Sequence, residues 1–150
     1  MFLFRFFFKR KSAKRKNFYR INLDEFILIS KHLINSTSTT HQLLGIIMAS
    51  GISLAHLKNQ NIKTPYNFKS DILYYALDNG LQIETYSLIC SNEISRCIEN
   101  LDKNRLLSID ARRINYVANN IFGFGITAKQ LKIIYSFACK VKRNFKLNYI

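Results

Sequence analysis

The chain has 150 residues, 48% of them hydrophobic, and a formal net charge of +14. This hydrophobic fraction can bury a core and argues against a wholly disordered chain, and the length suits a single domain. The charge is uneven. Residues 1–20 and 111–150 each carry eight Lys or Arg and no acid, whereas residues 21–110 carry seven basic and nine acidic residues. Two cationic ends therefore flank a nearly neutral middle, a pattern that favours a polyanionic partner such as nucleic acid or an anionic membrane.

Residues 1–20 are predicted to form an extended basic arm. Its cations are interleaved with Phe18 and Tyr19, and rings that stack on bases beside cations that meet phosphates are typical of RNA binding. The opening run, MFLFRFFF, is too short to span a bilayer. A disordered solubilising tail is the alternative interpretation. The arm residues expected to contact RNA are Lys9, Arg10, Lys11, Lys14, Arg15, Lys16 and Arg20.

Two helices are predicted next. Residues 22–34 begin with Asn22, a capping residue, and Glu25 occupies the capping-box position three residues later. Residues 41–50 form a second predicted helix that stops near Gly51, and the Ser- and Thr-rich stretch between the two helices supplies a turn.

The middle of the chain is less regular. Residues 58–70 contain the only Pro and are expected to be a polar loop. Residues 71–79 are predicted to be a short helix that ends at Gly80, and residues 84–101 a longer one. The mixed pattern over 106–122 is also assigned to helix.

The last element has the clearest pattern. Gly123 and Gly125 predict a turn, and Thr127 stands three residues before Gln130, as in a capping box. The apolar residues that then repeat at helical spacing are Ile134, Phe137, Ala138, Val141 and Phe145.

A stripe of single-sign charge is predicted along this last helix. Steps of three and four residues place on one side Lys129, Lys132, Ser136, Lys140 and Arg143. A solvated helix face usually carries both positive and negative side chains, so an uninterrupted cationic stripe favours binding of an external polyanion. The alternative interpretation is a solvated face without a binding function. The other predicted RNA contacts toward this end are Arg112, Arg113, Lys142 and Lys146.

Motifs for chemistry are absent from the sequence. It has no Gly-rich phosphate loop, no nucleophile elbow and no carboxylate cluster. Cys90, Cys97 and Cys139 lack the spacing of a zinc site and are expected to be reduced core thiols. The chain is therefore not expected to be an enzyme, and no catalytic residue, metal, cofactor or small-molecule substrate is predicted.

Two segments resemble the bacterial and organellar family of small-subunit ribosomal protein S eighteen. Residues 20–34 (RINLDEFILISKHLI) are similar by type to that family's first helix, which opens with Arg-Ile-Asp and runs through a Leu-Ile-Ser-Arg-like core. The family's last helix starts Thr-x-Lys-Gln and continues through Ala-x-Lys-x-x-Arg to a Leu-rich end. The similar positions in this sequence are Thr127, Lys129, Gln130, Ala138, Lys140, Arg143, Leu147 and Tyr149.

This resemblance implies a mainly α fold. It comprises a small helical core, a single strand for which Arg112, Arg113 and Ile114 are the candidates, a helical insertion at about 35–110, and the extended basic arm. Residues 21–150 would then form one helical domain. A weaker alternative is the small-subunit ribosomal protein S thirteen family, whose helix, Gly-x-Gly turn and helix resemble residues 120–131.

The function implied by the resemblance is that of a structural constituent of an organellar small ribosomal subunit, in a mitochondrion or plastid. Its partners would be the small-subunit rRNA and neighbouring ribosomal proteins such as S six. The abundance of residues with AT-rich codons, including 12 Phe and 8 Tyr, agrees with an organellar or parasitic genome. The alternative function is an amphipathic membrane-associated subunit of an organellar complex, because MFLFRFFFKRK pairs aromatic residues with cations. A DNA-binding helix-turn-helix protein is a third interpretation.

Overall fold

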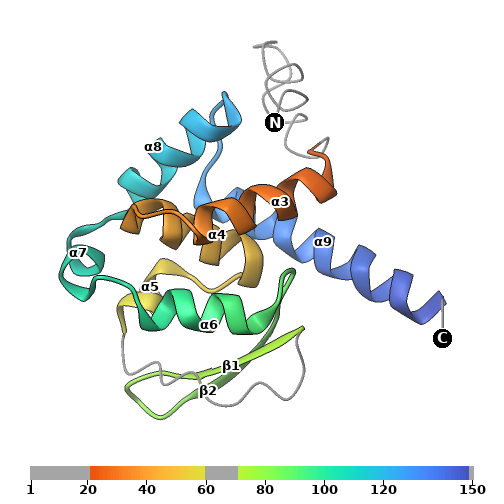
Figure 1. Cartoon of the computed structure of the whole chain (residues 1–150), viewed down its shortest axis with the longest axis horizontal. Coiled ribbons are helices and arrows are strands. Elements are labelled where there is room, and N and C mark those ends of the chain that lie inside the picture. The colour runs from red at the N-terminus through yellow and green to blue at the C-terminus, as the bar shows by residue number, and fades with distance from the viewer. Residues whose placement is uncertain (1–20, 60–70, 149–150) are drawn as a thin grey trace.

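The structure is a computed structural model that describes residues 21–59 and 71–148, with side chains in the last helix described as far as Arg143. The predicted arm (1–20) and most of the predicted polar loop lie outside the described residues. The described chain is mainly helical, as predicted, and contains one two-stranded antiparallel sheet. Figure 1 labels its elements, which are α3 (Leu23–Ile34), α4 (Thr39–Ser50), α5 (Leu54–Lys58), β1 (Ile72–Ala76), β2 (Gln82–Tyr86), α6 (Ser91–Glu99), α7 (Lys103–Ser108), α8 (Ala111–Phe122) and α9 (Ala128–Asn148).

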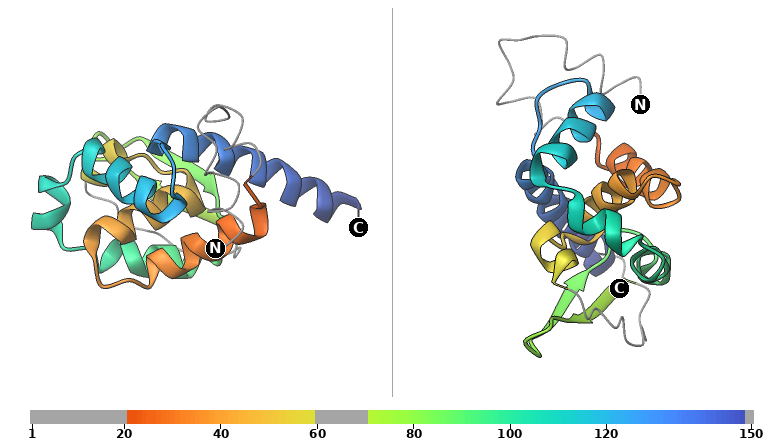
Figure 2. Two further views of the ribbon diagram at one scale, coloured as in Figure 1. Left: turned by 90° about the horizontal axis from the view of Figure 1, so that it is seen from above. Right: turned by 90° about the vertical axis from the view of Figure 1, so that its left-hand side faces the viewer.

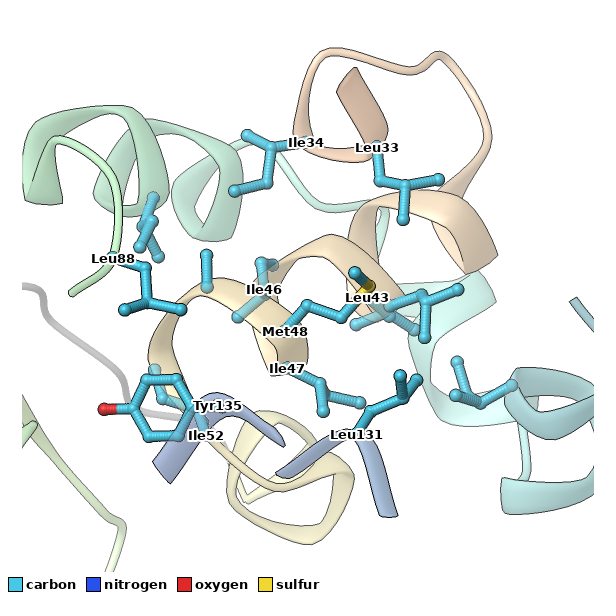
Figure 3. Close-up of a cluster of buried hydrophobic side chains, with 14 of the residues drawn as sticks. Leu33, Ile34, Leu43, Ile46, Ile47, Met48, Ile52, Leu88, Leu131 and Tyr135 are labelled. Carbon is cyan, nitrogen blue, oxygen red and sulfur yellow. The ribbon is translucent and has the colours of Figure 1, made fainter. Parts of the chain in front are cut away.

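Helix α4 lies at the centre of the fold. Every residue from 43 to 50 is buried, and the helix contacts α3, α6, α7, α8 and α9. A helix that is apolar all round must be enclosed on all sides, and the sequence LLGIIMA meets that condition. Figure 3 shows Ile46 and Met48 between Leu33 of α3 on one side and Leu131 of α9 on the other. In Figure 1 and in the right-hand view of Figure 2, α8 and the β-hairpin lie on opposite sides of α4.

A close approach of α3 to α4 depends on Gly45. A Cβ placed on Gly45 would lie 2.9 Å from the backbone nitrogen of Ile34 and 2.9 Å from the Cβ of Leu33. Both are atoms that cannot move far without shifting α3 itself. The absence of a side chain at Gly45 therefore sets the distance between the two helices.

The predicted start of the first helix and the predicted end of the second are confirmed, whereas α4 begins at Thr39, two residues earlier than predicted. The side-chain oxygen of Asn22 accepts hydrogen bonds from the backbone N–H groups of Asp24 (2.9 Å) and Glu25 (3.2 Å), so it caps α3. Helix α4 ends at Gly51, whose φ of 70° lies in the left-handed region that glycine adopts without strain.

The turn before α9 also follows the prediction. Helix α8 ends at Gly123, with φ of 76°. Thr127 and Gln130 then cap α9 reciprocally. The Thr127 N–H donates to the Gln130 side-chain oxygen (2.9 Å), and the Gln130 N–H donates to the Thr127 hydroxyl oxygen (3.2 Å). The turn is held to α8 by Asn119, whose side-chain oxygen accepts from the Ile126 N–H at 2.7 Å.

The predicted helix over 71–79 is wrong, because these residues contain strand β1. It pairs antiparallel with β2, with Leu73 opposite Thr85 and Tyr75 opposite Ile83. Leu73 and Tyr75 are buried while their neighbours in the strand are less so, which is the two-residue period of a half-buried strand. Only the later part of the predicted helix over 84–101 is helical, as α6.

The predicted strand around Arg112 is also wrong. Residues 106–122 are helical apart from a break between α7 and α8, in agreement with the helix predicted there. Arg112 and Arg113 occupy the first turn of α8, where the carboxylate of Asp110 caps the helix by accepting the Arg113 N–H at 3.0 Å. Within residues 21–59 and 71–148, no helix is both long and apolar enough to cross a membrane.

Replacing Gly45 by Ala tests the packing of α3 on α4. Helix propensity alone would stabilise the protein by roughly 0.5–1 kcal/mol. We expect instead a loss of about 1–3 kcal/mol in the free energy of unfolding, because the added methyl group overpacks the contact with α3. Urea denaturation measures this difference. Gly125→Ala is the matched control, since nothing lies within 4 Å of its Cβ position, and it should be nearly neutral. A Gly45→Ala protein that is more stable than the parent would contradict this packing.

Candidate nucleic-acid interface

The cationic stripe predicted on α9 lies on its exposed side. Lys129, Lys132, Ser136, Lys140 and Arg143 are all exposed, and the stripe runs for about 20 Å along the helix. Among the described residues, the ammonium groups of Lys129, Lys132 and Lys140 have neither an acidic partner nor a hydrogen bond. The structure thus brings together the cations that the periodicity predicted and leaves three of them open to an external anion.

Two cations near the end of this stripe hold α9 against the hairpin. Lys142 is partly buried, and its ammonium donates a hydrogen bond to the backbone oxygen of Leu88 at 2.7 Å. The guanidinium of Arg143 lies 4.8 Å from the centre of the Tyr86 ring, within cation–π range. Lys142 was predicted to contact RNA; this hydrogen bond engages one of its three N–H groups, and the contact stays a prediction. The side chain of Lys146, also a predicted contact, lies outside the described side chains.

The apolar face predicted for α9 is only partly confirmed. Ile134 and Ala138 are buried in the core, but Phe137 and Val141 are 60% and 45% exposed. With Ile133, which is 47% exposed, they form an exposed apolar row at steps of four residues next to the cationic stripe. Large apolar side chains gathered in this way commonly mark a contact surface.

The orientation of α9 is fixed by a polar junction around Tyr135. The Tyr135 hydroxyl donates to the backbone oxygen of Tyr86 and lies 3.0 Å from the Thr85 hydroxyl, which in turn donates to the backbone oxygen of Ser50 at 2.6 Å. Burial raises the pKa of Tyr135 well above its usual range, so the hydroxyl keeps its proton. Gly51 lies under this ring, because a Cβ there would be 2.4 Å from a Tyr135 ring carbon. The junction ties α4, the hairpin and α9 together.

A second basic surface surrounds the start of α4. Arg112 and Arg113 line a cleft of about 630 Å³, together with Ser38, Thr40 and His41 from the start of α4. A smaller adjoining cleft of about 290 Å³ is lined by Arg105, Arg113, Ser108, Ile109 and residues 38–40. Arg112 and Arg113 were predicted as RNA contacts, but the residues from α4 and α7 were not. No local signal marks them, since tertiary packing brings 38–41 against 105–116.

The first residues of α4 line these two clefts. Ser38 makes no side-chain cap, because its hydroxyl oxygen lies 3.0 Å from the ring nitrogen Nδ1 of His41. The first helical hydrogen bond runs from the Gln42 N–H to the Ser38 oxygen at 3.0 Å. Within the described part of the chain, the N–H groups of Thr39, Thr40 and His41 have no acceptor.

One acidic residue, Asp110, also lines the larger cleft. Its carboxylate is engaged at the cap of α8, and it is outnumbered by the nearby arginines. Arg105 forms an exposed ion pair with Asp102, at 3.7 Å. Such exposed pairs are weak, so another anion can replace the Asp102 carboxylate. The two clefts therefore have a positive electrostatic balance.

The cysteines do not assemble into a site. Cys97 and Cys139 are buried as predicted, whereas Cys90 is exposed. Burial raises the pKa of Cys97 to about 11, which keeps it as an unreactive thiol. Among the residues that the structure describes, no three His, Cys, Asp or Glu side chains are placed to hold a metal ion.

Comparison with models of protein families, with curated proteins and with solved structures found no match. The function is therefore inferred from the surfaces described above.

Replacing Tyr135 by Phe tests the junction that orients α9. The variant keeps the ring but leaves the buried backbone oxygen of Tyr86 without its donor, so we expect the free energy of unfolding to fall by about 1–3 kcal/mol. Thermal and urea denaturation would measure the loss. Tyr116→Phe removes the same atom from a side chain that is 67% exposed and should leave stability unchanged. Equal stabilities of the two variants would mean that the junction does not hold the helix.

Proposed function

We propose that the chain is a non-enzymatic, RNA-binding structural protein that holds RNA against the exposed cations of α9. The observation that carries this proposal is the row of Lys129, Lys132 and Lys140 on one helix face, with no acidic partner among the described residues. Like charges on one face repel each other, and a chain of phosphates removes that repulsion while it releases its own counterions.

The exposed apolar row of α9 favours RNA, rather than a small counterion, as the partner of these lysines. Phe137 projects beside the cations, and an exposed aromatic ring next to lysines can stack on an unpaired base while the lysines meet the backbone. Figure 2 shows the C-terminal half of α9 extending beyond the other helices, where a large partner can reach it. Recognition would rest on charge and shape, without a chemical step.

The more specific proposal is a constituent of an organellar small ribosomal subunit, with the small-subunit rRNA and neighbouring ribosomal proteins as partners. It is supported by the resemblance of the last helix to that of the S eighteen family, because Thr127 and Gln130 do open α9 as a capping box. It draws no support from Arg112 and Arg113, which lie in a helix where the resemblance implies a strand. Lys129, Lys140 and Arg143 are the matching cations.

An anionic membrane surface is the second candidate. The observation that favours it is the combination of Ile133, Phe137 and Val141 with flanking cations, since interfacial helices bury such an apolar row at the level of the lipid headgroups. The other side of α9 is packed on α4 and the hairpin, so only this row could enter the interface.

The double variant Lys132→Gln/Lys140→Gln tests RNA binding by α9. Affinity for a single-stranded RNA should fall with salt, and the slope of log K against log salt should become shallower by about 1.4 in the variant, because each lost phosphate contact removes about 0.7. Fluorescence anisotropy over a salt series measures both slopes.

The matched control is Lys31→Gln/Arg96→Gln, which removes two exposed charges from α3 and α6. It should leave the slope within error of the parent. The proposal fails if the two double variants behave alike, or if the parent has a flat salt response. Binding to vesicles rich in anionic lipid that is lost only in the α9 variant, without any RNA affinity, would favour the membrane candidate.

A further inference from the structure

The cleft at the start of α4 has the features of a built anion site, separate from the stripe on α9. Residues with three kinds of donor line it and the smaller cleft that adjoins it: backbone N–H groups of α4, threonine hydroxyls, and guanidinium groups from α7 and α8. We propose that this cleft binds the phosphate group of a nucleotide.

The first contribution comes from the backbone of α4. The N–H groups of Thr39, Thr40 and His41 have no acceptor among the described residues, and the aligned peptide dipoles of a twelve-residue helix place partial positive charge at this end. Free N–H groups and a positive helix end together favour a phosphate.

The second contribution is independent of the helix end. Thr40 is only 7% exposed and lines both clefts, yet its hydroxyl makes no hydrogen bond to any residue that the structure describes. Thr39 is 6% exposed, lines the smaller cleft and also lacks a hydroxyl partner within the described chain. Among the described residues, the Tyr86 hydroxyl is the only side-chain oxygen or nitrogen that is both buried and unpaired, so the two threonine hydroxyls are accessible from the cleft and can donate to a ligand that supplies acceptors.

The third contribution is positive charge from α7 and from the start of α8. Arg112 and Arg113 begin α8 and make no ion pair within the described chain, and Arg105 approaches the smaller cleft from α7. A phosphate presents oxygens in several directions, so it can accept hydrogen bonds from α4 and from a guanidinium fork at the same time. A carboxylate, with two oxygens in one plane, would satisfy fewer of these donors.

The size of the cleft and the position of Tyr116 indicate a ligand larger than phosphate, namely a nucleotide. About 630 Å³ is within the usual range for small-molecule sites and exceeds what a bare phosphate needs. Tyr116 lines the same cleft and is 67% exposed, which leaves a ring face on which a base can stack. Asp110 stands at the edge and opposes the anion.

Titration of the full chain with AMP, followed by isothermal calorimetry, tests the proposal. AMP should bind saturably, and adenosine, which lacks the phosphate, should bind at least about tenfold more weakly. Arg113→Gln should weaken AMP binding by about tenfold or more, because it removes a charged donor. Arg96→Gln, which removes an exposed arginine on α6, is the control and should change the affinity less than about twofold.

Two further variants sharpen the test. Thr40→Val keeps the shape of the buried side chain and should weaken AMP binding about fivefold or more, with its fold checked by thermal denaturation. Asp110→Asn retains a capping side chain and removes the opposing charge, so it should strengthen AMP binding. If AMP does not saturate, if adenosine binds as well as AMP, or if Arg113→Gln matches Arg96→Gln, the proposal is overturned.

The phosphate could belong to a free nucleotide or to a nucleotide within RNA, and a competition experiment distinguishes the two. An RNA source predicts that a single-stranded oligoribonucleotide displaces AMP, whereas a free-nucleotide source predicts that both bind together. In either case AMP affinity should survive Lys132→Gln/Lys140→Gln, so a failure of RNA binding by α9 and a failure of this site give different results.

Discussion

The enclosure of α4 is the constraint on which the rest of the fold depends. Its run of Leu, Ile and Met side chains is buried on every side, and each contributes about 1.5–3 kcal/mol relative to exposure. No single neighbour can cover such a helix, so α3, α6, α8 and α9 must all pack on it. The path of α4 therefore decides where each of the other helices lies.

The positions of both candidate surfaces depend on what packs at the two ends of α4. At its C-terminal end, Gly51 lets the Tyr135 ring approach, and the hydrogen bonds of that ring fix which side of α9 faces outward. At its N-terminal end, residues whose N–H groups have no acceptor in the described part of the chain line a cleft together with Arg112 and Arg113 of α8. We propose an extended polyanion as the partner of the lysine row on α9, and a single phosphate group as the ligand of the cleft.

The sequence allowed prediction of the features that short-range contacts determine. Asn22, Gly51 and the pair Thr127 and Gln130 lie next to the helix ends that they cap, so local spacing was enough to find them. The hairpin was missed because β1 is stabilised by pairing with β2, and because Gly80 reads equally well as a helix end or a turn. The cleft was missed for a related reason. The residues that line it are about 70 positions apart in the sequence and come together only because α4 is enclosed. No local sequence pattern predicts this long-range contact.

Sedimentation of the native protein is the sharpest test of the proposal that a phosphate-rich polymer covers the cationic faces. When a lysate of the source cells is separated on a density gradient, we expect the protein to migrate with small ribosomal subunits. After ribonuclease treatment it should move to the light fractions. Migration that ribonuclease does not change, or recovery of the protein with membranes, would contradict the claim.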